Sequence, residues 1–202
     1  MPFARRSLSR LRLTALAAAG AALLGLAGCE TPAPGNSFPE LGYSHLPQLS
    51  LAVGRIDIVQ EYRPPAQPPN VEHMFPVRPA AAAERWARDR LKAAGGPGEL
   101  RVVIVRAAVV EVPLKQSGGI RGAFTNEQAE RYDGEMEMRL ELTAPEASGT
   151  VSARAERRRT VPEDISLADR EKVWFQLTEA MMNDLNESLE RQVKKNFANW
   201  LQ

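Results

Sequence analysis

Residue types that build catalytic and metal sites are scarce in this chain. Its 202 residues include one cysteine, Cys29, and two histidines, His45 and His73. One cysteine excludes an internal disulfide, and two histidines in separate proline-flanked segments lack the spacing of a metal site. The sequence also has no Gly-x-Ser-x-Gly elbow and no Gly-Lys-Ser/Thr phosphate loop. We therefore predict no catalytic residue, no metal and no cofactor, and we expect both histidines to be solvated.

A surplus of positive charge is missing as well. The whole chain has 26 basic and 25 acidic side chains. Residues 1–28 hold four arginines and no acid, so the rest of the chain has 22 basic and 25 acidic side chains. Nucleic-acid-binding domains are normally strongly basic. We therefore expect no nucleic-acid partner.

The apolar run near the N-terminus is too short for a membrane span. It covers residues 13–27, whereas a spanning helix needs about 20 residues. The arginines precede it, and a charged head followed by a short apolar run is typical of a secretory signal. We predict that residues 1–28 are a signal peptide that is removed on export.

The apolar run ends in Leu26-Ala27-Gly28-Cys29, which resembles the lipobox of bacterial lipoproteins. The resemblance implies cleavage before Cys29 and acylation of its thiol, and two or more acyl chains anchor a protein stably. In such proteins an aspartate after the cysteine marks retention at the inner membrane. Glu30 stands there instead, which favours the outer membrane, with the protein facing the periplasm. The alternative is an ordinary signal peptide with a chance cysteine.

Proline, glycine and serine dominate the segment after the cysteine. Residues 29–48 lack hydrophobic periodicity and predict a lipidated cysteine followed by a flexible tether. Residues 49–202 remain for a single α/β periplasmic domain, which is long enough to bury a hydrophobic core.

Patterning in the first half of this domain predicts a strand, a loop and a helix. Residues 49–62 are strand-like, and their apolar parity changes at Gly54, which predicts a bulge. Residues 80–94 are strong helix formers, and Gly95-Gly96 should end the helix. The six prolines of residues 63–79 indicate an extended loop. Its apolar side chains should cover part of the core: Val71, Met74, Phe75 and Val77.

The next part of the chain predicts a buried strand and a hairpin. Residues 100–112 are rich in β-branched side chains, typical of a buried central strand. Residues 132–143 alternate between apolar and charged side chains, and residues 151–161 form their expected partner. The polar, glycine-containing residues 115–130 should form a mobile loop between them.

Charge pairing suggests a register for this hairpin. We expect cross-strand pairs of Arg154 and Arg158 with acids of the first strand. The favoured alignment places three pairs opposite each other: Glu141 with Arg154, Arg139 with Glu156, and Glu137 with Arg158. Arg157 and Arg159 fall on the apolar parity. Either the core has ended there or they meet helix acids such as Asp169 and Glu171.

A continuous apolar stripe predicts one long helix over residues 166–201. Ser166, with Asp169 three residues later, forms a capping-box-like start. A straight helix of this length would span roughly 54 Å, longer than a small domain is wide. We therefore expect a bend or break near Asn183 or Asn186, or a terminal turn that overhangs.

Together these elements predict an α+β fold. We expect a two-layer sandwich with a mostly antiparallel sheet of about four strands, two helices on one face and a long C-terminal helix.

The loop of residues 115–130 is the candidate partner-binding segment. Ile120 and Phe124 flank Arg121 in otherwise polar sequence, and aromatic and arginine side chains dominate interface energies. The alternative is that Phe124 packs back onto the sheet.

Residues 80–201 resemble the LPS-assembly lipoprotein family in element order. The similarity includes residues 129–132 (Ala-Glu-Arg-Tyr) before one strand and residues 151–154 (Val-Ser-Ala-Arg) opening the next. Auxiliary lipoproteins of envelope ABC-transport systems share a similar plan. The resemblance implies a non-enzymatic accessory subunit in outer-membrane biogenesis or lipid and LPS transport, with a barrel or ABC transporter component as partner. The alternative is a periplasmic module that binds a small ligand or lipid.

Overall fold

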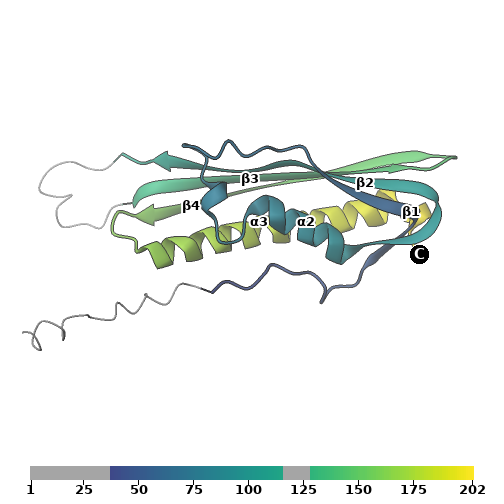
Figure 1. Ribbon diagram of the computed structural model, residues 1–202, viewed down its shortest axis with the longest axis horizontal. Coiled ribbons are helices and arrows are strands. Elements are labelled where there is room, and N and C mark those ends of the chain that lie inside the picture. Colours follow the sequence, from purple (N-terminus) through teal and green to yellow (C-terminus); the bar gives the residue numbers. More distant parts are fainter. Residues whose placement is uncertain (1–36, 116–127) are drawn as a thin grey trace, which may run out of the picture. The chain divides into compact units, whose positions relative to one another are not determined.

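The computed structural model describes residues 37–115 and 128–202. Four strands form one sheet in the order β1-β2-β3-β4 (Figure 1). β1 and β2 run parallel, whereas the β2–β3 and β3–β4 pairs are antiparallel. The sheet is therefore mixed but mostly antiparallel, and the predicted α+β class is confirmed. The strand bounds are β1 Leu49–Gln60, β2 Leu91–Pro113, β3 Gln128–Thr143 and β4 Ser148–Pro162.

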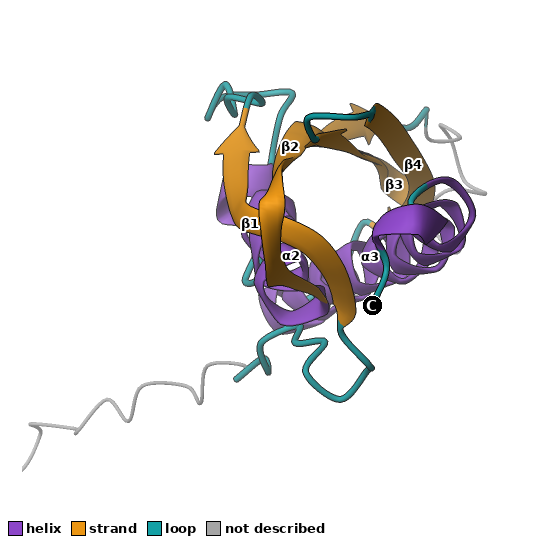
Figure 2. Cartoon of the chain, turned by 90° about the vertical axis from the view of Figure 1, so that its right-hand side faces the viewer, coloured by secondary structure: helices purple, strands orange, loops and turns teal. Residues whose placement is uncertain are grey.

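Both helices lie on the same face of the sheet, as predicted. They are α2, Pro79–Arg90, and α3, Leu167–Asn196, and Figure 2 shows them on the inner side of the curved strands. α2 connects the parallel strands β1 and β2, because strands that run parallel need a crossover between them. No helix in the described part of the chain is both long and apolar enough to cross a membrane.

The predicted end of the first helix at Gly95-Gly96 is wrong. α2 ends at Arg90, and Leu91 already pairs with Leu49 in the sheet. The glycines lie instead within β2, where its register with β1 shifts. A side chain at Gly54 would meet the carbonyl oxygen of Gly96 at 2.7 Å, so only glycine permits this approach. The predicted irregularity at Gly54 is confirmed, but its partner is a second glycine far along the chain.

The hairpin of β3 and β4 has the predicted faces but not the predicted register. Tyr132, Met136, Met138, Leu140 and Leu142 are buried on one face of β3. Glu137, not Glu141, lies opposite Arg154. Asp133, not Glu137, lies opposite Arg158. The apolar side chains decide this alignment, because burying one of them stabilises the fold by about 1.5–3 kcal/mol, against roughly 0.2–1 kcal/mol for a cross-strand charge pair.

α3 begins as predicted and does not break where predicted. The Ser166 hydroxyl accepts a 3.1 Å hydrogen bond from the Asp169 N–H, so the capping start is confirmed. The helix then continues through Asn183 and Asn186 to Asn196, followed by the 3-10 turn η4, Ala198–Trp200. The expected break is absent from this helix, and within it the Asn186 side chain accepts hydrogen bonds from Trp86 and Arg90 of α2.

The proline-rich segment covers the core only in part. Val71 and Phe75 are buried and Val77 is half-buried, as expected for covering residues. Met74, in the short 3-10 helix η2 (Glu72–Met74), is 50% exposed, so the prediction for it is wrong. The packed part of the chain also begins before Leu49, because Tyr43 is buried.

Candidate functional site

The predicted site residues lie outside the described part of the chain. Cys29 is in the first undescribed range, and Ile120, Arg121 and Phe124 are in the second. What the structure does describe is the base of the 115–130 loop. There the Leu114 N–H donates a 2.8 Å hydrogen bond to the Ala129 carbonyl and closes the β2–β3 ladder.

The two histidines do not converge with other titratable groups on a site. His45 and His73 are both exposed, as predicted, and His45 stacks on Tyr43 at a centroid distance of 6.4 Å. Among the described residues, no group of three His, Cys, Asp or Glu side chains is placed to hold a metal ion.

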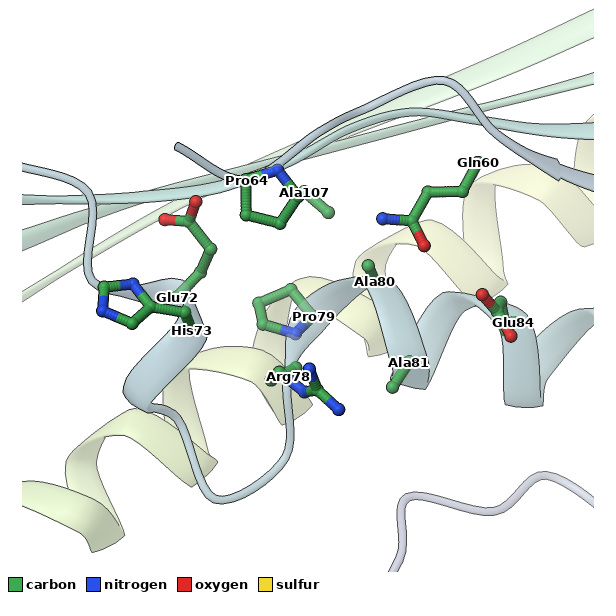
Figure 3. Close-up of a pocket in the computed structure, with 10 residues that line it drawn as sticks. All are labelled: Gln60, Pro64, Glu72, His73, Arg78, Pro79, Ala80, Ala81, Glu84 and Ala107. Carbon is green, nitrogen blue, oxygen red and sulfur yellow. The ribbon is translucent and has the colours of Figure 1, made fainter. Parts of the chain in front are cut away.

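A cavity of about 260 Å³ lies between the end of β1, η2 and the start of α2 (Figure 3). The titratable side chains in its wall are Glu72, His73, Arg78 and Glu84. Figure 3 shows that these side chains point in different directions rather than toward one reacting centre. General acid–base chemistry needs such groups within hydrogen-bond reach of a common point.

Glu72 is buried in this wall, with only 2% of its surface exposed. Its carboxylate accepts hydrogen bonds from the Tyr62 hydroxyl (2.7 Å), the Val109 N–H (3.0 Å) and the Asn70 amide (3.2 Å). Burial, and then the hydrogen bond to Glu72, raise the pKa of Tyr62 above its usual value. The carboxylate therefore fastens the proline-rich segment to β2, and its acceptor positions are occupied by the protein itself.

Arg90 is a second buried charge that the sequence did not single out. It is 1% exposed and donates to the Asn186 side chain (3.1 Å), to Glu190 (2.6 Å) and to the Pro47 carbonyl. Lys194 first, and then Arg90, lower the pKa of Glu190. Arg90 therefore ties α2, α3 and the incoming chain together. In the sequence, its position four residues after Trp86, on the same face of the helix, could have indicated that Arg90 is buried.

We call residues 37–48 the entry segment, because they bring the chain onto the helices. Phe38 stacks on Phe175 of α3 at a centroid distance of 5.2 Å. The Tyr43 N–H donates a 2.8 Å hydrogen bond to Asp89 of α2, and burial followed by the nearby charge of Glu179 raises the pKa of Tyr43 to about 12. These contacts hold the entry segment against α2 and α3.

The sheet face opposite the helices carries linked ion pairs. Arg139 contacts Glu141 (2.6 Å) and Glu61 (3.6 Å), and Arg101 contacts the same two acids at 3.0 and 3.3 Å. Farther along, Arg154 meets Glu135 at 3.0 Å. Positive and negative side chains alternate, so the charges within this network offset each other.

The consecutive arginines of β4 have partners on different sides of the sheet, because neighbouring side chains of a strand point to opposite faces. Arg158 pairs across the strands with Asp133 at 3.6 Å, so cross-strand pairing is confirmed for it. Arg157 meets Asp184 of α3 at 2.6 Å. A helix acid is therefore its partner, although neither of the two acids named as examples.

An apolar hollow lies at the start of α3 and measures about 490 Å³. We call it the α3 hollow and define it by its wall: Met74, Ile165, Leu167, Arg170, Glu171 and Trp174. The Arg170 side chain is held by Glu130 at 2.8 Å. Trp174 stacks on Phe75 at a centroid distance of 5.0 Å, and its buried indole N–H has no acceptor among the described residues.

Comparison with known proteins yields distant structural likenesses. No protein-family model and no curated protein matches the chain. A PelC dodecamer variant from Paraburkholderia phytofirmans is 14% identical, covering 74% of this chain and 93% of its own, with a TM-score of 0.24. A DUF330 family protein from Xanthomonas campestris is 12% identical, covering 70% and 85%, with a TM-score of 0.28. Likenesses with TM-scores this low do not indicate a function.

Proposed function

We propose that this protein is a non-enzymatic lipoprotein of the bacterial cell envelope. It is anchored through acyl chains on Cys29 in the outer membrane and faces the periplasm. There it acts as an accessory subunit in outer-membrane biogenesis or in lipid and LPS transport. Its partner is an envelope protein, either a barrel or a component of an ABC transporter.

The observation that carries this proposal is the N-terminal sequence. An arginine-rich head, a short apolar run and Leu26-Ala27-Gly28-Cys29 follow one another in the order of a lipoprotein signal. The only thiol of the chain stands where the lipid is attached. An anchored domain of this kind acts through the surfaces that it presents to neighbours at the membrane.

The described side chains support a binding role over a catalytic one. The buried carboxylate of Glu72 is saturated by the protein's own donors. The buried Arg90 is likewise bound to side chains and a carbonyl of the fold. Catalytic groups need a free position toward a reacting atom, so these two groups serve the architecture.

The second candidate is a periplasmic module that binds a small ligand or lipid. The α3 hollow favours it, because about 490 Å³ falls within the usual range of ligand sites, roughly 300–1,000 Å³. Purification in mild detergent separates the two functions. Recovery of a barrel or transporter component supports the accessory subunit, whereas a bound lipid without a protein partner supports the second candidate.

The anchor is tested by replacing its thiol. Cys29→Ala should abolish incorporation of radiolabelled fatty acid, because only the thiol can accept the lipid. Gly28→Ala is the matched control: it keeps both the thiol and a small residue before the cleavage point, and should still be labelled. Equal labelling of Cys29→Ala and the unchanged protein would refute the lipoprotein assignment.

A further inference from the structure

We infer that the α3 hollow is a membrane-contact surface, which takes up the acyl and ester region of the bilayer that holds the anchor. This inference rests on the proposed acylation of Cys29. It adds the orientation of the domain and the chemistry of the surface that touches the lipid.

Exposed apolar side chains are concentrated at this hollow. Among the described residues, the large hydrophobic side chains that are exposed are Leu167 (69%) and Met74 (50%). They come from different segments of the chain, and both line the hollow. A single exposed apolar residue needs no explanation, whereas two from different segments that line one hollow make that hollow a candidate contact surface.

The indole of Trp174 adds an unused hydrogen-bond donor to the same wall. Trp174 is 4% exposed, and its N–H has no partner among the described residues. A buried donor without an acceptor costs about 1–3 kcal/mol. An ester oxygen of a phospholipid is a suitable acceptor where the acyl chain enters the hollow and reaches this buried N–H, and tryptophan is enriched where apolar lipid meets water.

The length of the tether is sufficient for the anchor to reach this end of α3. Phe38 is held on Phe175, and eight residues separate it from Cys29. A fully extended chain of this length reaches about 30 Å. Along the helix axis, Leu167 lies about 12 Å from Phe175, whereas the other end of α3, at Asn196, lies about 32 Å away. In Figure 1 the described chain begins beside the first half of α3.

The charges around the hollow favour lipid over a strongly charged partner. Arg170 is already paired with Glu130 at 2.8 Å, and Glu171 also has an interaction partner. What remains for a ligand is the apolar surface of Met74, Ile165 and Leu167, beside the buried indole of Trp174. An acyl chain bearing an ester group offers the matching chemistry.

The test uses the full-length lipidated protein in phosphatidylcholine vesicles that contain a nitroxide-labelled phosphatidylcholine. Leu167→Cys is labelled with a bimane fluorophore, because acylation leaves Cys29 unreactive. Ser152→Cys, exposed on the outer side of β4, is the matched control. We expect the nitroxide lipid to quench the label at position 167 several-fold more strongly than the label at position 152. A label on Met74→Cys should be quenched as strongly as the label on Leu167→Cys. Agreement between the two positions shows that the quenching does not come from a local change in structure caused by one substitution.

Equal quenching at positions 167 and 152, in protein that floats with the vesicles, would overturn the inference and leave the anchor intact. Protein that neither floats nor incorporates fatty acid would refute the anchor itself. A label at position 167 that is shielded from iodide but not quenched by nitroxide lipid would show that protein fills the hollow. That result would also overturn the inference.

Discussion

Glu72 and Arg90 are charged side chains that the fold buries and then satisfies completely with its own groups. Each connects segments that are distant in sequence: Glu72 joins the proline-rich segment to β2, and Arg90 joins α2 to α3 and to the entry segment. Removing one partner of such a group leaves a buried charge uncompensated, which is strongly destabilising. At the scale of single residues, these two charges therefore hold the parts of the domain in place.

The two buried tryptophans should respond differently to loss of their indole N–H. Trp86 donates a 2.9 Å hydrogen bond to Asn186, whereas the N–H of Trp174 has no acceptor in the described structure. Replacement by phenylalanine removes a similar volume at both positions. We therefore expect Trp86→Phe to lower the free energy of unfolding by about 1 kcal/mol more than Trp174→Phe, since a net hydrogen bond contributes about that much. Urea unfolding of both variants measures the difference, and equal losses would contradict it.

At the scale of elements, the register of the β3–β4 hairpin depends on two competing contributions, apolar packing and charge pairing. In the observed register Met136, Met138 and Leu140 each face a smaller apolar residue of β4. Arg157, on the apolar parity, lies opposite Gly134 and reaches Asp184, while the Met181 side chain fills the space beside Gly134. The register favoured by charge alone would place Arg157 opposite Met138 in the core. Exposed charge pairs are worth at most about 1 kcal/mol, so the packing decides.

Engineered cysteines can test this register directly. Residues directly opposite each other on antiparallel strands have Cα atoms about 4.5–5.5 Å apart, which lies within the range that disulfides span, about 4.4–6.8 Å. In a Cys29→Ser background, the Glu137→Cys/Arg154→Cys pair should oxidise to a disulfide, because these positions are partners. The control pair, Glu141→Cys/Arg154→Cys, should keep two free thiols. Thiol titration after mild oxidation distinguishes them, and the opposite result would restore the register inferred from charge.

At the scale of the whole molecule, ion pairs make stability depend on pH. Hydrogen bonds from Arg139 and then Arg101 lower the pKa of Glu141, and Lys194 and then Arg90 lower that of Glu190. A carboxyl whose pKa is lower in the folded state stabilises the fold above its unfolded pKa, about 4.3 for glutamate. That contribution is lost as the pH falls through the folded pKa. The urea midpoint should therefore decrease from pH 7 toward pH 3.

Glu190→Gln tests this expectation, because glutamine keeps the shape and cannot titrate. Its urea midpoint should be lower than that of the unchanged protein at pH 7, and the two should converge at low pH. A constant gap between the two proteins across this range would show that the Glu190 charge is not the cause.

Local pattern alone was sufficient for the class of the fold. Alternation identified the buried face of β3, helix formers placed both helices, and the Ser166–Asp169 spacing predicted the start of α3. These features depend on neighbours within a few residues, so the sequence contains the relevant information. The candidate site could be predicted less well: the motif around Cys29 is visible in the sequence, whereas the α3 hollow is assembled from η2, the β4–α3 connection and α3.

Only the tertiary structure decided between conformations that the local sequence allows equally well. Gly95-Gly96 could end a helix or admit an irregular strand, and only the approach of β1 at Gly54 selected the strand. Asn186 could mark a break in α3 or lie within it, and in the folded chain it lies within the helix and accepts hydrogen bonds from Trp86 and Arg90. In each case the deciding partner lies far away in the chain. Side-chain packing and hydrogen bonding between such segments exceed the small energy differences that separate the local options.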